Sequence, residues 1–203
     1  MDFWDNIAFA YDMAESLNGK VYNEITELVK RLVPKGAEVL DCAAGTGALS
    51  VAAAKKAHKV VCTDLSENML FRARKKAKKC GADNIVFEKR NIFDLCDEDG
   101  TYDCVIAGNV LHLLGDPQRA VKELCRVTKK GGKIILPTFT WENKEHFLLK
   151  AYKLIGFKPR RGYTPESYYK MLKDCNAGKV KMKLIDGMVP CCVAVIYVPQ
   201  TAA

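Results

Sequence analysis

The residues best placed to do chemistry follow the first two predicted strands. Asp41 ends one apolar run, Gly45 and Gly47 form the turn after it, and Asp64 ends a second apolar run. In an open α/β sheet, a ligand binds at the carboxyl ends of the strands, near the switch in strand order. Glycine lets a ligand approach the backbone closely, and Asp64 is placed to bind the two hydroxyls of a ribose.

The same turn argues against a dinucleotide cofactor. Residues 45–50 read GTGALS, so the third glycine of the pyrophosphate fingerprint is missing. Asp41 would also place a carboxylate beside a pyrophosphate, which charge repulsion disfavours. Beside the ammonium group of an amino acid the same carboxylate is favourable. A ligand with an amino-acid end and a ribose end, but no phosphate, is S-adenosylmethionine.

Strands and helices that position these residues alternate along the chain. The predicted strands are residues 38–42, 60–64, 85–88, 102–107, 133–138, 179–185 and 188–198. The predicted helices are residues 21–33, 48–57, 66–80, 164–175 and one from Asp116 that the Gly131–Gly132 pair closes. This alternation indicates a parallel sheet covered on both faces. The two-residue link Asp186–Gly187 predicts an antiparallel hairpin at the end.

Five segments give the chain a resemblance to the class I S-adenosylmethionine-dependent methyltransferases. Residues 39–47 (VLDCAAGTG), 63–70, 91–95, 103–112 and 124–136 resemble the successive motifs of that family. The sequence of the first motif is most similar to that of the ubiquinone/menaquinone-biosynthesis group of small-molecule methyltransferases. The resemblance implies a Rossmann-like, doubly wound, mostly parallel seven-stranded sheet with an antiparallel last strand. It also implies in-line methyl transfer to an O, N, S or C nucleophile, with S-adenosylhomocysteine as product.

For the methionine end of the cofactor, the resemblance implies specific contacts. Asp41 would act near the ammonium group, and the backbone at Ala43, Gly45 and Gly47 would contact the methionine part. Asn109 would present its backbone carbonyl to the same end. Ala43 replaces the usual first glycine of the motif.

For the ribose and adenine, the resemblance implies a second group of contacts. Asp64 would bind the ribose hydroxyls, and Leu65 and Met69 would pack on the adenine. Asn91 would accept a hydrogen bond from the adenine amino group, with the Ile92 amide facing a ring nitrogen. Asn91 replaces an aspartate, so the bond lacks charge assistance and we expect modestly weaker adenine discrimination.

Two residues are candidates for a catalytic role. His112 follows the fourth strand and could act as a general base or as a positioning residue. Tyr11 lies in a segment that resembles the N-terminal lid of the family, and the lid role is favoured over simple packing of that segment on the core. The segment 141–161 is expected to form part of the acceptor pocket with Tyr163 and Tyr168.

We expect one domain over residues 1–203. It would comprise an N-terminal lid and helix (1–33), a cofactor-binding core (37–138), an acceptor-site insertion with a helix (139–178) and a terminal β-hairpin (179–198). The longest apolar stretch is too short to span a bilayer, and the acidic N-terminus does not resemble a signal peptide. A cytoplasmic protein with no membrane span is therefore expected.

Charge bears on the partner. The chain carries 32 basic and 24 acidic residues, and its net charge of +8 lies in the segment from Lys144 to Lys183. That location favours an anionic small-molecule acceptor or an acidic surface partner, with Lys158, Arg160 and Arg161 as the first charges to test. Nucleic acid is possible but not favoured, because the fourth strand ends in AGNV rather than in an Asn-Pro-Pro-Tyr-type run.

The nine cysteines include no C-x-x-C pair and no zinc-like grouping with histidine. We expect free thiols in a reducing compartment and no metal site. A metalloid or thiol-chemistry role for Cys191 and Cys192 stays open as an alternative. Two further alternatives for the whole chain are an RNA or protein methyltransferase and a non-catalytic, cofactor-binding regulatory protein.

Overall fold

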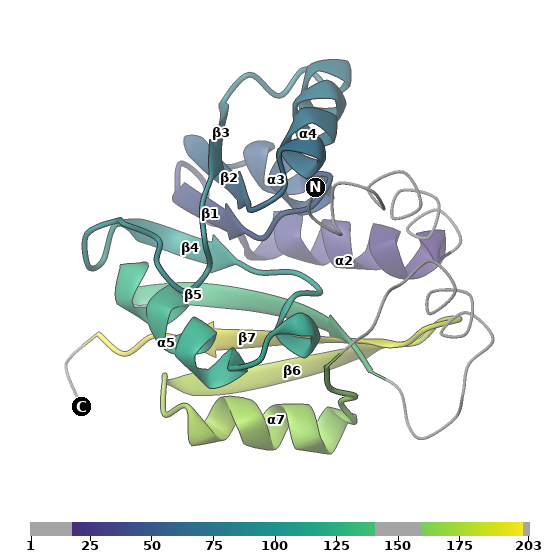
Figure 1. The fold of residues 1–203 in the computed structure, drawn as a ribbon, viewed down its shortest axis with the longest axis vertical. Coiled ribbons are helices and arrows are strands. Elements are labelled where there is room, and N and C mark those ends of the chain that lie inside the picture. Colours follow the sequence, from purple (N-terminus) through teal and green to yellow (C-terminus); the bar gives the residue numbers. More distant parts are fainter. Residues whose placement is uncertain (1–17, 141–159, 201–203) are drawn as a thin grey trace.

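The computed structural model describes residues 18–140 and 160–200 (Figure 1). The strands in these ranges are β1 (Glu38–Cys42), β2 (Lys59–Asp64), β3 (Ile85–Lys89), β4 (Tyr102–Ile106), β5 (Thr128–Phe139), β6 (Lys179–Ile185) and β7 (Cys191–Tyr197). The helices are α2 (Gly19–Leu32), α3 (Ala48–Ala54), α4 (Glu67–Lys79), the 3-10 helix η1 (Leu111–Leu113), α5 (Pro117–Val127) and α7 (Pro165–Asp174).

All the strands join one seven-stranded sheet in the order β3-β2-β1-β4-β5-β7-β6. The pairs among β1 to β5 are parallel, whereas β7 pairs antiparallel with both β5 and β6. The last strand therefore runs against the others, which confirms the predicted fold class. The chain moves outward from β1 to β3 and then returns to β4 on the other side of β1. The switch in strand order thus lies between β1 and β4.

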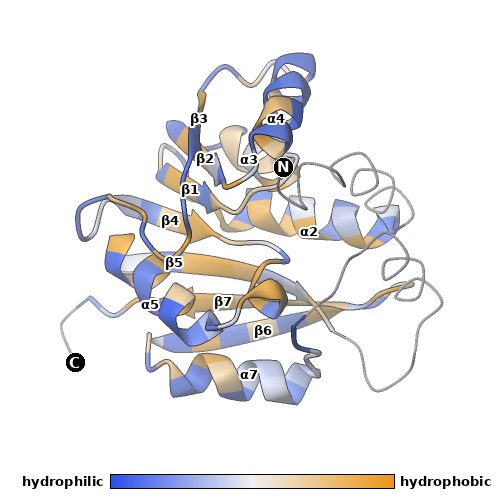
Figure 2. Cartoon of the chain, viewed as in Figure 1, coloured by the Kyte–Doolittle hydropathy of each residue, from blue (hydrophilic) through white to orange (hydrophobic). Residues whose placement is uncertain are grey.

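Helices cover both faces of the sheet. On one face, Val29 of α2, Ala53 of α3 and Leu70 of α4 belong to one buried apolar cluster. On the other, Leu124 of α5 and Leu172 of α7 belong to a second. Figure 2 shows hydrophobic colouring along the central strands β5 and β7 and mixed colouring on the helices. The burial of both faces explains why the central strands are nearly continuous apolar runs.

The predicted starts of three helices are confirmed by their caps. The side chains of Ser66, Asp116 and Thr164 each accept a hydrogen bond from the backbone N–H three residues ahead. Each bond satisfies one of the N–H groups that a helix start leaves without an intrahelical partner. In α5 and α7 a proline follows the cap directly, where its missing N–H costs nothing.

The predicted helix ends are less accurate. The helix after Asp116 was expected to run to the glycine pair, but α5 ends at Val127 and β5 begins at Thr128. The Thr128 hydroxyl donates to the carbonyl of Leu124, and the extended backbone at Thr128 then pairs with β4. The pair Gly131–Gly132 instead lies in the irregular first part of β5. The alanine-rich helix α3 also ends early, at Ala54.

The terminal hairpin is confirmed, but its turn is longer than predicted. Residues 186–190 separate β6 from β7, whereas only Asp186–Gly187 was expected between them. The two residues before β7 have other partners, which explains the difference. The side chain of Asn18 donates to the Val189 carbonyl, and the Thr140 N–H donates to the Pro190 carbonyl. Pro190 also has no N–H to give to the ladder.

None of the described helices has both the length and the apolar character needed to cross a membrane. All nine cysteines are free thiols, as expected. Cys191 and Cys192 have no exposed surface, and burial raises the pKa of both thiols. Thiol chemistry at these two positions is disfavoured, because a reactive cysteine needs access and a low pKa. The described residues contain no cluster of three or more potential metal ligands.

Candidate cofactor site

Three adjacent strands bring the predicted site residues to one edge of the sheet. Asp64 ends β2, Asp41 lies near the end of β1, and Asn109 follows β4 by three residues. These strands are neighbours in the order β2-β1-β4, on both sides of the switch point. The carboxyl ends of parallel strands meet at one edge, so the topology places these three side chains together.

The Asp64 carboxylate is fixed by backbone amides. One oxygen accepts a hydrogen bond from the N–H of Gly45 at 2.9 Å, and the other accepts from the N–H of Ser66 at 2.9 Å. Both donors belong to the backbone and both bonds are charge-assisted. The carboxylate is therefore oriented between the turn after β1 and the start of α4.

The turn after β1 uses left-handed backbone conformations. Ala43 has a φ of +52°, Gly45 of +56° and Gly47 of +78°. A side chain at the last position would also collide with α4, because a Cβ there would lie 2.8 Å from the Cβ of Ala73. Gly47 is thus required both for its φ and for the close packing of α3 on α4. At Ala43 an ordinary residue is held where glycine is preferred, which explains the family's usual glycine.

Asp41 is completely buried at the centre of this edge. Its Oδ2 accepts a hydrogen bond from the Ser50 hydroxyl at 2.6 Å, while its Oδ1 has no partner among the described residues. Burial raises the pKa of the Asp41 carboxyl to about 7, and the Ser50 bond opposes that rise. An ionised carboxylate in this position is stabilised by a positively charged donor.

Asn109 provides a second buried acceptor beside it. Its backbone φ is +53°, its N–H donates to the Pro137 carbonyl at 2.8 Å, and its side-chain nitrogen lies 3.4 Å from the Tyr22 hydroxyl. The side-chain oxygen is buried without a donor in the part of the chain that the structure describes. A left-handed asparagine with an unpaired oxygen is a strained arrangement of the kind that clusters at ligand sites.

The predicted adenine contacts lie at the ends of β2 and β3. Leu65 is 49% exposed, whereas Met69 and Ile92 are buried in the core. The side-chain oxygen of Asn91 accepts a hydrogen bond from the N–H of Phe93 at 3.0 Å. Leu65 is thus the apolar side chain open to a ligand, and Asn91 already uses one acceptor position in its own turn.

The predicted catalytic residue His112 lies in η1 with 1% of its surface exposed. Burial lowers its pKa to about 3, so the imidazole is neutral at physiological pH. Its Nδ1 is 3.4 Å from the Thr138 hydroxyl. Its backbone carbonyl accepts hydrogen bonds from the N–H groups of Arg160 and Arg161 at 3.1 and 3.2 Å. His112 therefore anchors the chain where it returns after residues 141–159.

The two tyrosines expected in the acceptor pocket have different surroundings. Tyr168 is fully buried, and its hydroxyl donates to the Leu136 carbonyl at 3.1 Å, so it belongs to the core. Tyr163 packs against it with ring centroids 5.1 Å apart, and its hydroxyl is buried without a partner among the described residues. Tyr11, Lys158 and the segment 141–159 lie outside the described residues.

Comparison with known proteins decides the family. A model described as a methyltransferase domain matches residues 34–174, which is more than half of the chain and includes every motif of the cofactor edge. The chain belongs to this methyltransferase family. The resemblance in the sequence is thereby confirmed, and the chain is a member of the S-adenosylmethionine-dependent methyltransferases.

Curated relatives point in the same direction. A ubiquinone/menaquinone biosynthesis C-methyltransferase from Bdellovibrio bacteriovorus is 39% identical over 106 residues, which cover 51% of this chain and 45% of that protein. A demethylmenaquinone methyltransferase from Clavibacter sepedonicus is 32% identical over 142 residues, which cover 68% of this chain and 56% of that protein. The methyltransferase thus spans about half the length of the curated relatives it matches.

Solved structures share the fold. A methyltransferase of Haloferax volcanii, determined in complex with a methyltransferase activator, superposes with a TM-score of 0.77. The match covers 98% of this chain and 99% of that chain at 17% sequence identity. A Bacillus halodurans methyltransferase superposes with a TM-score of 0.71 over 87% of this chain and 99% of its own, at 18% identity. Likeness at this identity supports the fold alone.

The residues of this methyltransferase fit the cofactor that its family uses. Asp41 and Asn109 each leave a buried oxygen without a donor among the described residues. S-Adenosylmethionine carries an ammonium group that can donate to both and a sulfonium charge that a nearby carboxylate favours. Asp64 adds an oriented carboxylate one strand away.

Several residues of this edge were missed by sequence reasoning. Ser50 holds Asp41, Tyr22 contacts Asn109, and the Lys76 ammonium donates to the Thr46 hydroxyl at 2.8 Å. One feature of the sequence could have identified Ser50, because it is a polar residue among alanines on a helix that follows the motif. No feature of the sequence could have identified Tyr22, since its partner Asn109 lies 87 residues further along the chain.

Proposed function

We propose that this methyltransferase binds S-adenosylmethionine along the β2-β1-β4 edge and transfers its methyl group to a nucleophile of a small, anionic molecule. The observation that carries the proposal is the pair of unpartnered buried oxygens, Asp41 Oδ1 and Asn109 Oδ1, beside the fixed carboxylate of Asp64. A site lined by acceptors without donors suits a cationic ligand with hydroxyl groups.

Each residue then has a role in binding. Asp41 Oδ1 and Asn109 Oδ1 accept hydrogen bonds from the methionine ammonium group, and the backbone carbonyl of Asn109 faces the same end of the cofactor. The turn from Ala43 to Gly47 lies against the methionine chain. Asp64 accepts the two ribose hydroxyls, because its orientation is fixed by the amides of Gly45 and Ser66. Leu65 covers the adenine.

Asn91 and the Ile92 amide face the adenine edge in this proposal. When bound, the cofactor supplies a methyl group already activated by sulfonium. The protein has to align the acceptor with that group and exclude water. Tyr11 would contribute to this exclusion as part of a lid, a prediction that the described residues do not test.

Arg160 supports an anionic acceptor. Its side chain has no hydrogen-bond partner among the described residues, and a Cβ on Gly115 would lie 3.9 Å from its Nη1. Arg161 differs, because its guanidinium donates to the Gly115 carbonyl at 2.6 Å. Arg161 therefore fixes the loop after η1, while the Arg160 guanidinium is the one that would bind an anionic acceptor in this proposal.

A small-molecule acceptor is also supported by the relatives, which are named as a ubiquinone/menaquinone biosynthesis C-methyltransferase and a demethylmenaquinone methyltransferase. An RNA or protein acceptor, or a regulatory role without turnover, are the alternatives that the test must separate.

The first test is calorimetric titration with S-adenosylmethionine and S-adenosylhomocysteine. Saturable binding of either supports the proposal, and no detectable binding of both overturns it. Turnover of cofactor labelled on its methyl group, against a small-molecule panel, bulk RNA and protein, then separates the acceptor classes. Binding without turnover on every acceptor would favour the regulatory alternative.

The charge of the acceptor is tested by neutralising Lys158, Arg160 and Arg161 to glutamine, singly and together. We expect Arg160→Gln to raise the acceptor KM and to weaken its dependence on salt concentration. Arg161→Gln serves as the comparison, because its guanidinium already bonds to a backbone carbonyl. Unchanged KM and salt dependence in the triple variant would contradict an anionic acceptor.

A further inference from the structure

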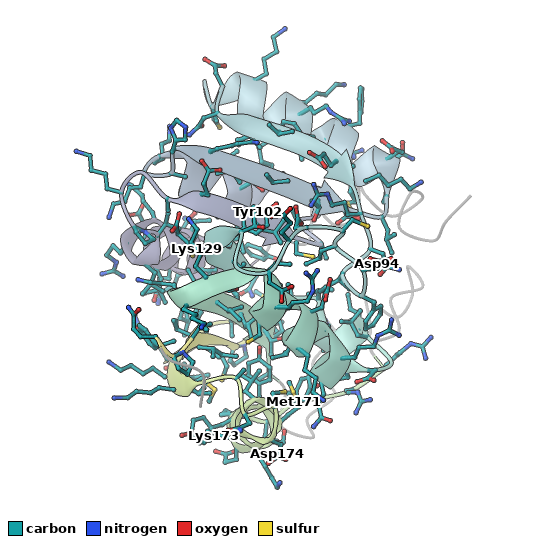
Figure 3. All side chains as sticks on the ribbon, turned by 90° about the vertical axis from the view of Figure 1, so that its left-hand side faces the viewer. Asp94, Tyr102, Lys129, Met171, Lys173 and Asp174 are labelled. Atoms are coloured by element: carbon teal, nitrogen blue, oxygen red, sulfur yellow. The ribbon has the colours of Figure 1, made fainter. Side chains whose placement is uncertain are left out.

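A basic hollow lies at the amino ends of the parallel strands, away from the cofactor edge. It encloses about 320 Å³ and is lined by the segment before β1, by the irregular start of β5 and by Gln200. Four lysines line it, Lys35, Lys129, Lys130 and Lys133, against the single carboxylate of Asp103. Figure 3 views this side of the molecule and shows Lys129 on it.

The carboxylate in the hollow is already neutralised. Asp103 accepts hydrogen bonds from the Lys129 ammonium and from the backbone N–H of Glu38, both at 2.8 Å. Lys35 and Lys130, by contrast, have no ion-pair or hydrogen-bond partner among the described residues, and both are exposed at the rim. Two unpaired ammonium groups therefore face a hollow whose one acid is occupied.

Glycine backbone forms part of the hollow's surface. Gly36 has a φ of +74°, and a Cβ added to it would point into open space. Gly132 is packed so closely that a Cβ would lie 2.8 Å from the Lys129 carbonyl oxygen and 2.9 Å from that of Asp103. The N–H groups of Gly36 and Gly131 already donate to the carbonyls of Lys56 and of Val198 and Pro199, so the attraction for an anion comes from the lysine side chains around this backbone.

The basic surface continues from the hollow across the sheet. Lys133 of β5 is paired with Tyr197 of β7, and Tyr197 is paired with Lys179 of β6. Directly paired residues project from the same face of a sheet, so these three side chains form a row. The Lys181 ammonium lies 5.4 Å from the centre of the Tyr197 ring.

We propose that this hollow binds a phosphate group of a polyphosphorylated anion, and that Lys179 and Lys181 hold the phosphates that follow. The spacing of charge along the row suits a ligand with several phosphates, and Tyr197 offers an aromatic ring among the lysines. The five residues of β1 separate the hollow from the cofactor edge by about 17 Å. The site is therefore independent of S-adenosylmethionine binding.

Free polyphosphates and the backbone of a single-stranded nucleic acid share this chemistry. The test uses the full chain and two probes, sodium tripolyphosphate in calorimetry and a fluorescein-labelled RNA of about 12 nucleotides in anisotropy. The variant is Lys35→Gln with Lys130→Gln. Its matched control is Lys122→Gln with Lys173→Gln, two exposed lysines on α5 and α7, which cover the other face of the sheet.

We expect the hollow variant to weaken binding of whichever probe is the ligand about tenfold. The control variant should bind as the wild type does. If the ligand is a polynucleotide, Lys179→Gln with Lys181→Gln weakens RNA binding as well and lowers its salt dependence. If it is a free polyphosphate, tripolyphosphate binds with the higher affinity and RNA binding is negligible.

Two results would overturn the proposal. One is the absence of binding for both probes at low salt, and the other is an equal loss of affinity in the hollow and control variants. S-Adenosylmethionine affinity is measured on every variant as a separate readout. Because the two sites are independent, unchanged cofactor affinity in the hollow variant also shows that the protein is folded.

Discussion

The Asp64 carboxylate accepts a hydrogen bond from the Gly45 N–H at 2.9 Å, and this bond ties the end of β2 to the turn after β1. Its second oxygen is held by the N–H of Ser66 at the same distance. Since both donors are backbone groups, the carboxylate needs little rearrangement to bind two hydroxyls. Such preorganisation lowers the entropic cost of binding.

Replacing this carboxylate by an amide should weaken cofactor binding. We expect Asp64→Asn to raise the Kd for S-adenosylmethionine about 10- to 100-fold, because a charged acceptor is lost and an NH2 group can face the Gly45 N–H. Calorimetry measures the change. Asp83→Asn, at an exposed position before β3, is the control and should bind normally. Equal affinity of Asp64→Asn and wild type would contradict the ribose role.

The raised pKa of the Asp41 carboxyl leads us to expect that cofactor affinity depends on pH. Its pKa is raised to about 7 by burial, so the carboxyl is mostly neutral at lower pH. The ammonium group of the cofactor prefers the ionised form, and it stays protonated below its own pKa near 7.7. Affinity should therefore rise by up to about tenfold per unit between about pH 5.5 and pH 7.

Variants at this position separate the carboxyl from other titrating groups. Asp41→Asn should bind weakly and show no such pH dependence, as measured by titration at several pH values. Ser50→Ala should shift the rise to higher pH, because the Ser50 hydrogen bond lowers the pKa of Asp41. A wild-type Kd that does not change over this range would be inconsistent with the prediction.

Much of the fold could be predicted from sequence, since it follows from local patterns. Caps at Ser66, Asp116 and Thr164 fix three helix starts through bonds to residues three positions ahead. Ends set by tertiary partners could not be predicted in this way. The hairpin turn is lengthened by bonds from Asn18 and Thr140, which lie far from it in sequence.

The candidate site also contains features that sequence patterns predict and features that depend on tertiary packing. The meeting of Asp41 with Asp64 follows from parallel strands, whose carboxyl ends share one edge. The contacts of Ser50 and Tyr22 depend on how α3 and α2 are rotated on the sheet. That rotation could not be predicted from the pattern of residues in the sequence. The burial of His112 was likewise not predicted, because it arises from residues of β5 and of the segment after residue 159.

Ala43 should be a position where glycine stabilises the protein. Its φ of +52° raises the free energy of the folded state by about 1 kcal/mol for an alanine but not for a glycine, which has no Cβ. Ala43→Gly should therefore raise the free energy of unfolding by up to about 1 kcal/mol in chemical denaturation. Ala52→Gly in the interior of α3 should lower it by about the same amount. The same sign for both variants would refute the argument.

Gly47 should show the opposite behaviour. Gly47→Ala combines an unfavourable φ of +78° with a Cβ only 2.8 Å from that of Ala73. We expect a loss of about 1–3 kcal/mol in unfolding free energy, measured with urea. Ala73→Gly removes the collision but not the strained φ, and it costs about 1 kcal/mol by itself in the interior of α4, so Gly47→Ala should cost less in the Ala73→Gly background than in the wild type. An equal cost of Gly47→Ala in the two backgrounds would mean that contact with α4 is unimportant.

Replacing His112 should show whether it acts as a general base or as a positioning residue. Loss of a general base typically lowers kcat by about 10²–10⁴-fold. Since the ring is buried and its carbonyl holds Arg160 and Arg161, we expect His112→Gln to lower kcat less than about tenfold and to raise the acceptor KM. Steady-state kinetics with the identified acceptor decide between the two. A larger loss of kcat with unchanged KM would assign the base role.

The pH dependence of stability gives His112 a second readout. Because the folded pKa is lowered to about 3 and an unfolded histidine titrates near 6.5, the unfolded state binds the extra proton between these values. The contribution of this residue to stability is therefore complete above about pH 6.5 and is lost as the pH falls toward 3. His112→Gln should be less acid-sensitive than wild type in thermal melts over that range. Parallel curves for the two proteins would show that the ring is accessible to protons in the folded state.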